Sequence, residues 1–375
     1  MKFLFTIGVL LALLACSPDQ NMVTTVDDKA TTETVALYKN LFKIADKGFM
    51  FGHEDDMAYG IGWWAEEGRS DVKEVTGSYP AVHGWDVGKI GTEMNLDSVR
   101  FDDMVRWIKE VYQRGGINTI SWHMDNLVSN EGSWDKTPAV KAILPEGSTH
   151  EAFLSKLDAL VDFFNQCNVD GVKIPIVFRP WHEHNGDWFW WGKGNCTEED
   201  YIALWKFTID YLRSQGVNQL IYAFSPDRSR MNMEKLKQDY FYGYPGDEYV
   251  DIMGIDNYFD VGSEYNNKSI EESKIDFIKS LELVTLIAKK KNKVAALTET
   301  GNSGIEVPNW YTNVLLAPIR ENQNTIKIAW TLVWRNRFLN HMYVPHPEHP
   351  QADDFLQFKE DELTIFEEDL QNIYR

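Results

Sequence analysis

The sequence is short of cysteine, of positive charge and of long apolar runs. Its 375 residues include 3 cysteines, and 37 lysines and arginines face 57 aspartates and glutamates, for a formal net charge of −20. The deficit of positive charge excludes the basic surface on which nucleic-acid binding depends, and it argues against a polybasic membrane-surface protein. No glycine-rich phosphate loop occurs early in the chain, and no linker rich in Pro, Gly or Ser follows residue 34, so we expect one folded domain.

The longest apolar run lies at the N-terminus and is too short to cross a membrane. Residues 1–15 read MKFLFTIGVLLALLA, which is a positive start, an apolar stretch and a small final residue, typical of a signal peptide. Cys16 follows at once, and Leu-Leu-Ala-Cys resembles the lipobox of bacterial lipoproteins. That resemblance implies cleavage before Cys16, its acylation, and an outer-membrane lipoprotein that faces the periplasm or the cell surface. A secreted protein with a free Cys16 is the alternative.

The next segment is polar and divides the leader from the folded part. Residues 16–34 lack aromatic side chains, so we expect a flexible tether with a lipidated Cys16, followed by the catalytic domain over 35–375. Two cysteines then remain, Cys167 and Cys196, which are too few for a thiolate zinc site. They could form one disulfide in an oxidising compartment, and the spacing leaves open whether they meet.

Short apolar runs alternate with amphipathic stretches along the whole of residues 35–375. Amphipathic spacing predicts helices over 97–114, 151–167, 198–215, 270–291 and 310–320. The predicted strands are Phe49–His53, Pro80–Asp86, Asn118–His123, Ile174–Pro180, Leu220–Pro226, Asp251–Asp256, Ala295–Glu299 and Ile326–Trp334.

Strands that alternate with helices indicate parallel βα units, and eight such units are the number that closes a barrel. The alternative, a doubly wound open sheet, would favour an early phosphate loop. The predicted fold class is therefore α/β, a single (β/α)8 TIM barrel, whose chemistry belongs at the carboxyl ends of the strands. Polar side chains occur there: His53, Asp86, His123, Glu183, Ser225, Asp256, Glu299 and Arg335.

Two glutamates at strand ends form the strongest chemical signal. Glu183 follows the fourth predicted strand in the segment Arg-Pro-Trp-His-Glu-His-Asn-Gly-Asp-Trp-Phe-Trp-Trp-Gly, and Glu299 ends the seventh in Leu-Thr-Glu-Thr-Gly. In a closed barrel these ends face each other across the mouth. A protonated and an ionised carboxyl group beside an aromatic wall are what glycoside hydrolysis requires. The 14 tryptophans, which can serve as flat platforms for sugar rings, favour the same interpretation.

A metal site is the competing interpretation of the first segment. His182 and His184 flank Glu183, and two histidines with a carboxylate can bind zinc. Alternate side chains of an extended segment point to opposite sides, however, so the three side chains do not converge easily. We therefore predict no metal and no cofactor.

The segment 179–192 and Leu297-Thr-Glu-Thr-Gly301 resemble the two signatures of glycoside hydrolase family 26, whose best-known activity is β-1,4-mannanase. The resemblance extends over residues 35–375 and implies a retaining (β/α)8 hydrolase with Glu183 as acid/base and Glu299 as nucleophile. It also implies sugar-site or nucleophile contacts for a set of residues by their motif positions: His123, His182, Trp188, Tyr258, Trp334 and Arg335.

The expected function is hydrolysis of β-1,4-mannan by double displacement, with the two carboxyl groups about 5–5.5 Å apart. Endo action and mannobiose-releasing exo action both stay open, and the stretch 125–149 is a candidate wall across the cleft. β-1,3-Xylanase and mixed-linkage β-glucanase activities are alternatives on the same site. A non-catalytic, glycan-binding surface lipoprotein is the alternative from another class. The expected partners are mannan or manno-oligosaccharides and, through the lipid, a membrane; we expect no nucleic acid and a monomeric protein.

Overall fold

The computed structural model describes residues 23–375. The predicted signal peptide, residues 1–15, and the predicted lipidation site Cys16 lie outside the described residues, as do residues 17–22 of the expected tether.

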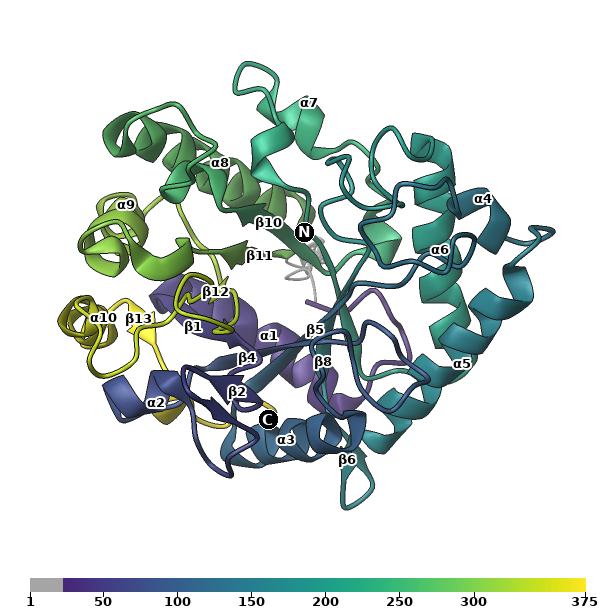
Figure 1. The fold of residues 1–375 in the computed structure, drawn as a ribbon, viewed down its shortest axis with the longest axis horizontal. Helices are drawn as coiled ribbons and strands as arrows, with labels where there is room; N and C mark the ends of the chain where they lie inside the picture. The colour runs from purple at the N-terminus through teal and green to yellow at the C-terminus, as the bar shows by residue number, and fades with distance from the viewer. Residues whose placement is uncertain (1–22) are drawn as a thin grey trace, which may run out of the picture.

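Eight parallel strands form a closed barrel that is surrounded by helices (Figure 1). Each strand pairs with its neighbours in chain order, and the ring closes because the last barrel strand pairs with the first. Every residue of these strands is buried, as expected for parallel strands that are covered on both faces. The barrel strands are β1 (Phe49–Glu54), β4 (Val82–Asp86), β5 (Ile117–Trp122), β8 (Ile176–Pro180), β9 (Leu220–Phe224), β10 (Ile252–Asn257), β11 (Val294–Thr300) and β12 (Trp330–Val333).

Each predicted strand overlaps one of these observed strands, so the predicted single (β/α)8 barrel is confirmed. The long amphipathic stretches are the outer helices, which bury one side against the barrel. They are α3 (Phe101–Arg114), α5 (His150–Gln166), α6 (Glu198–Ser214) and α8 (Ile270–Lys291). The predicted helix over 310–320 begins as a π-helix, Trp310–Leu316, and continues as α9 (Ala317–Glu321).

The structure also contains shorter strands and helices, which the periodicity of the sequence does not predict. One of them, β13 (Thr364–Ile365), pairs with the first two residues of β1. The later residues of β1, from Gly52 on, pair with β4 instead. The others are β2 (Tyr59–Gly60), β3 (Trp63–Trp64), β6 (Asn168–Val169), β7 (Val172–Lys173), α2 (Asp71–Thr76), α4 (Val140–Ile143), α7 (Leu236–Tyr240) and α10 (Ala352–Lys359).

The helix α1 (Thr32–Lys47) covers the end of the barrel at which the strands begin. Its side chains Leu37, Tyr38 and Leu41 share one buried cluster with strand residues such as Met50 and Ile252. This end of the barrel is therefore filled with apolar side chains, and only the opposite end, where the strands finish, remains for a site.

The folded domain begins before the predicted boundary at Val35. Thr25 and Asp27 are buried, and the backbone N–H of Val26 donates to Oδ1 of Asp251 at 2.7 Å. The described part of the expected tether thus packs on the barrel, because its polar residues find buried partners there. Within residues 23–375, no helix combines the length and the apolar character needed to cross a membrane.

The two cysteines of the domain are not bridged. Cys167 is buried, Cys196 is half-buried, and both are free thiols. Burial raises the thiol pKa of each to about 12, so neither is a reactive thiolate at neutral pH.

Candidate active site

Glu183 lies just beyond β8 in a sharply bent segment. Trp181 and Glu183 both have φ = +52°, a left-handed backbone conformation that is strained for large side chains. The bend is held by two backbone hydrogen bonds: the N–H of Glu183 donates to the carbonyl of Ser225, and the N–H of Gly186 donates to the carbonyl of Glu183, both at 2.9 Å. The bend turns Glu183 toward the barrel mouth, where its side chain remains partly exposed.

The surroundings of Glu183 favour its protonated form. Burial raises its pKa, and the negative charges of Asp227, Glu299 and Asp256 raise it further, to well above the usual value. The indole Nε1–H of Trp188 donates to Oε2 of Glu183 at 2.8 Å and opposes part of this shift. The surroundings of Glu183 therefore favour a carboxylic acid that a ligand can reach.

Glu299 is directed into the mouth by a bulge in β11. Along the β10–β11 ladder Leu297 lies opposite Ile255, but Glu299 lies opposite Asp256, so Thr298 is an extra residue on the bulged strand. The hydroxyl of Thr298 donates to Oδ1 of Asp256 at 2.7 Å and fixes the bulge.

Two donors hold the carboxylate of Glu299. The hydroxyl of Tyr258 donates to Oε2 at 3.0 Å, and the guanidinium of Arg179 donates to Oε1. These two hydrogen bonds fix the side chain of Glu299 in one orientation.

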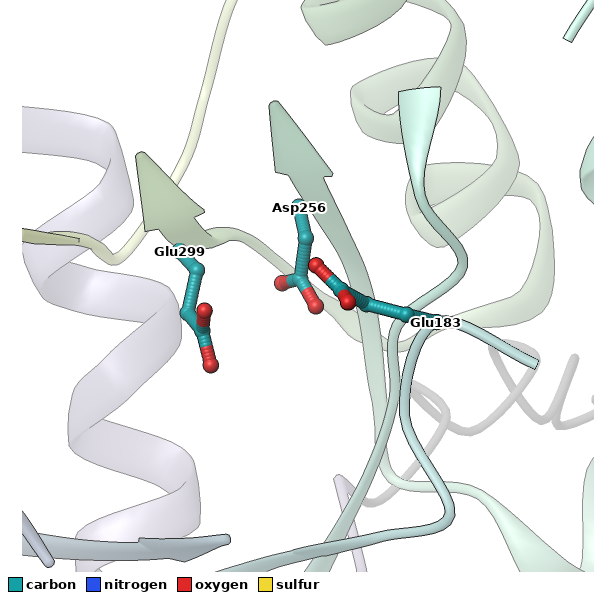
Figure 2. Close-up of side chains that lie close together, drawn as sticks. All are labelled: Glu183, Asp256 and Glu299. Atoms are coloured by element: carbon teal, nitrogen blue, oxygen red, sulfur yellow. The ribbon is translucent and has the colours of Figure 1, made fainter. Parts of the chain in front are cut away.

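Figure 2 shows Asp256 between Glu299 and Glu183, with the carboxyl group of Glu183 directed toward that of Asp256. One carboxylate oxygen of each residue lies within 4.8 Å of the corresponding oxygens of the other two. The nearest oxygens of the three carboxyl groups are thus close neighbours.

Arg179 is the buried cation of this acidic cluster. Its Nη1 donates to Oδ2 of Asp256 at 2.8 Å and to the hydroxyl of Ser225 at 3.0 Å, and its Nη2 donates to Glu299. Burial opposes its charge, but the charges of Asp256 and Glu299 outweigh burial and raise the pKa of Arg179. The three carboxylates are close enough to bind a metal ion, yet a guanidinium already binds two of them.

The two histidines beside Glu183 point away from a shared metal position. The Nε2 of His184 lies 2.6 Å from the carbonyl of Tyr242, and its ring stacks on Tyr201 with centroids 4.2 Å apart. His182 instead contacts His123, with their Nε2 atoms 3.2 Å apart. The zinc interpretation of the His-Glu-His segment therefore has no support in the geometry.

His123 and His182 form a chain of hydrogen bonds that ends at Asp86. The Nδ1 of His123 lies 2.6 Å from Oδ2 of Asp86. Burial disfavours the charge of Asp86, but His123 and the hydroxyl of Ser121 outweigh burial and lower its pKa. Burial and the charge of Arg179 lower the pKa of His182 well below its usual value. His182 is therefore neutral, and one of the two facing Nε2 atoms donates to the other.

One tryptophan of the segment 188–191 lines the mouth, and the other two belong to the buried core. Trp188 is partly exposed and bonds to Glu183, whereas Trp190 and Trp191 are fully buried and donate to the carbonyls of Met124 and His182 at 2.9 Å. Between them lies Phe189, which packs edge-on against the rings of His123 and His182.

The two residues after β12 reach the same mouth from another side. The ring of Trp334 lies edge-on to His123, with centroids 5.9 Å apart. Arg335 lies over Trp334 at 5.7 Å and forms an ion pair with Asp97 of the β4–α3 loop. The predicted site residues thus form three groups of direct contacts: Glu183 with Trp188, Glu299 with Tyr258, and His123 with His182 and Trp334. Arg335 lies beside Trp334, and its charge is paired with Asp97.

No specific function was predicted from the sequence for three charged residues of the mouth. Arg179, Asp256 and Glu54 stand at or near the carboxyl ends of β8, β10 and β1. A charged residue in an otherwise apolar strand is the signal that could have identified each of them.

Comparisons with known proteins identify similar sequences and structures. The family model described as "Glycosyl hydrolase family 26" matches residues 26–343. A mannan endo-1,4-beta-mannosidase of Bifidobacterium adolescentis is 34% identical over 295 residues, which are 76% of this chain and 28% of that protein. One of Bacillus subtilis is 35% identical over 210 residues, 50% of this chain and 53% of that protein. The aligned residues thus span about a quarter to a half of the length of these two curated relatives.

Solved structures resemble the chain over nearly all of its length. A "GH26 beta-mannanase from Bacteroides ovatus" has a TM-score of 0.84 at 40% identity and covers 92% of this chain and 98% of that one. A modular endo-beta-1,4-mannanase from Cellulomonas fimi has a TM-score of 0.86 at 32% identity and covers 94% of this chain and 79% of that one.

Replacing Arg179 tests whether its charge holds the acidic cluster together. We expect Arg179→Met to lower the free energy of unfolding by about 3–5 kcal/mol, because it leaves Asp256 and Glu299 buried without their cation. The matched control is Arg106→Met, which removes an exposed arginine paired with Asp103 and Glu110 and should cost at most about 1 kcal/mol. Urea unfolding at pH 7 measures both. Equal losses would show that the cluster does not depend on the buried guanidinium.

Proposed function

This chain belongs to glycosyl hydrolase family 26, and on that premise we propose that it hydrolyses β-1,4-mannan with retention of configuration at the anomeric carbon. The observation that carries the proposal is the placement of Glu183, favoured as an acid, within 4.8 Å of Glu299, which is held by Arg179 and Tyr258. Two carboxyl groups this close suit a covalent intermediate, since no water molecule has to fit between them.

The first step transfers the sugar to the enzyme. The carboxylate of Glu299 attacks the anomeric carbon, the glycosidic C–O bond breaks, and the proton of Glu183 passes to the departing oxygen. A raised pKa keeps that proton on Glu183 until it is needed. The hydrogen bonds from Tyr258 and Arg179 hold the attacking carboxylate in position.

The second step returns the enzyme to its starting state. Glu183, now a carboxylate, takes a proton from water, the water oxygen bonds to the anomeric carbon, and the ester bond to Glu299 breaks. Atoms and charges balance without a metal or an organic cofactor, so the reaction needs neither.

The remaining mouth residues are proposed to bind the sugars on either side of the bond that breaks. His123, His182 and Trp188 lie directly beside the acid, and Trp334 and Arg335 lie beyond His123. Mannan is the proposed polymer because the curated relatives above are mannan endo-1,4-beta-mannosidases by name and both reported structures are titled as mannanases.

Hydrolysis of unbranched β-1,4-mannan tests the proposal. We expect wild type to release manno-oligosaccharides, and Glu299→Ala to lose at least about 10³-fold in kcat because no nucleophile remains. Glu183→Ala should lose about 10²–10⁴-fold on mannan, and less on an aryl mannoside whose leaving group needs no proton. The control Glu271→Ala, an exposed glutamate on α8, should keep full activity.

Product analysis of the same reaction separates the remaining choices. Mannobiose alone from the earliest time indicates exo action, and a spread of oligosaccharides indicates endo action. Cleavage of β-1,3-xylan or mixed-linkage glucan with mannan left intact would refute the proposed substrate. A fully active Glu299→Ala variant would refute the mechanism.

The fall of kcat/KM at alkaline pH reports the pKa of the catalytic acid, Glu183. In the free enzyme kcat/KM falls with rising pH as Glu183 loses its proton. Burial raises the pKa of Asp227 to about 6, so above that pH Asp227 is charged and raises the pKa of Glu183. Asp227→Asn removes this charge, the pKa of Glu183 falls, and the alkaline limb should move to lower pH. Asp103→Asn on the outer helix α3 should leave the limb in place, and a limb that moves to higher pH in Asp227→Asn would contradict the assignment of Glu183.

We further propose that the protein is an outer-membrane lipoprotein anchored through Cys16, on the strength of the Leu-Leu-Ala-Cys sequence behind the apolar leader. Expressed in a Gram-negative host, wild type should sediment with membranes and incorporate labelled palmitate. Cys16→Ser should do neither, because the thiol that accepts the lipid is gone. Equal membrane association of the two proteins would exclude a lipid anchor at this cysteine.

A further inference from the structure

Glu54 is a buried glutamate of the barrel mouth for which the mechanism above has no use. It is the last residue of β1, and its side chain is 3% exposed. The preceding His53 contacts Asp56 at 3.0 Å. Because successive side chains of a strand point to opposite sides, Glu54 points to the side opposite His53, toward the interior that holds Glu299.

The neighbouring strand makes room for this side chain. Glu54 pairs in register with Gly84 of β4. A Cβ atom at position 84 would lie 1.9 Å from Oε2 of Glu54 and 3.0 Å from Cδ1 of Leu332. Glycine is therefore required at position 84 for a carboxyl group to occupy this place.

One oxygen of Glu54 has no protein partner. Its Oε1 is buried and accepts or donates no hydrogen bond among the described residues. Burial of an unpaired polar atom costs free energy, so a hydrogen bond from outside the chain would stabilise this oxygen.

The charges around Glu54 determine its protonation state. Burial raises its pKa, and the carboxylates of Asp55, Glu299 and Asp86 raise it further, while Arg179 alone among its charged neighbours acts against them. Its pKa thus lies well above the usual value, and its surroundings favour the carboxylic acid. A carboxylic acid offers one O–H donor and an acceptor oxygen, the pair of groups that a sugar hydroxyl can meet.

We propose that Glu54 is a substrate-positioning residue whose carboxyl group hydrogen-bonds a hydroxyl of the sugar unit attacked by Glu299. The inference rests on the proposed glycosidase function. It explains together the unpaired oxygen, the glycine opposite it and the location in the mouth. In its protonated form the group adds a polar contact without a further negative charge beside the nucleophile.

Two variants of Glu54 test the proposal on β-1,4-linked mannohexaose. Glu54→Gln keeps the shape, a donor and an acceptor, and we expect kcat/KM within about threefold of wild type. Glu54→Met fills the same space without hydrogen-bonding groups, and we expect a loss of about tenfold or more. The thermal midpoint of Glu54→Met should equal or exceed that of wild type, because an unpaired buried polar atom has been removed.

A second buried glutamate provides the matched control. Glu367 is 8% exposed and fully engaged outside the barrel, with Arg114 at 2.7 Å and His83 at 3.3 Å. Glu367→Met should show the reverse pattern, a lower thermal midpoint with unchanged activity of the folded enzyme.

Three outcomes would overturn the inference while the proposed function stands. They are a Glu54→Met variant as active as wild type, a Glu54→Gln variant as impaired as Glu54→Met, and a Glu54→Met variant that loses stability and activity together. A wild-type enzyme inactive on mannohexaose would instead remove the proposed function, and this inference with it.

Discussion

The buried guanidinium of Arg179 is the interaction on which the site depends. Glu299, Asp256 and Glu183 converge within 4.8 Å, and like charges at such distances repel strongly in a poorly hydrated interior. Arg179 compensates part of that repulsion through its bonds to Asp256 and Glu299. Burial and the neighbouring carboxylates raise the pKa of Glu183 and of Glu54 well above the usual value. The mouth thus combines a glutamate held in place by Arg179 with glutamates whose surroundings favour the protonated form, a combination that suits a two-carboxylate mechanism.

The barrel tolerates this concentration of charge because its apolar packing and its polar side chains lie at opposite ends. The end covered by α1 is apolar, with Leu37 and Tyr38 packed into the strand ends, and the outer helices bury a second apolar layer. Polar and strained features gather at the opposite end: the left-handed Glu183, the bulge at Thr298 and the unpaired oxygen of Glu54. Local strain of this kind persists only where the surrounding structure fixes it.

Much of this arrangement could be predicted from the sequence, and the reasons for success and failure are physical. The strands were predictable because most of their residues are apolar and polar residues lie at or near their ends. Glu183 and Glu299 stood out because they follow the fourth predicted strand and end the seventh. The pairings of Arg179 with Asp256 and of Arg335 with Asp97 were not, because they join side chains far apart in the chain. The packing of residues 25–34 escaped prediction for a related reason: a polar segment looks like a tether until its buried partner, here Asp251, is known.

The most direct test of the account is the configuration of the first product. Proton NMR of mannohexaose hydrolysis, recorded before the sugar anomers equilibrate, distinguishes the two forms of the new reducing end. Two displacements at one carbon, first by Glu299 and then by water, predict that the β-anomer appears first. The α-anomer as the first product would mean that water attacks directly, and it would contradict the assignment of Glu299 as the nucleophile.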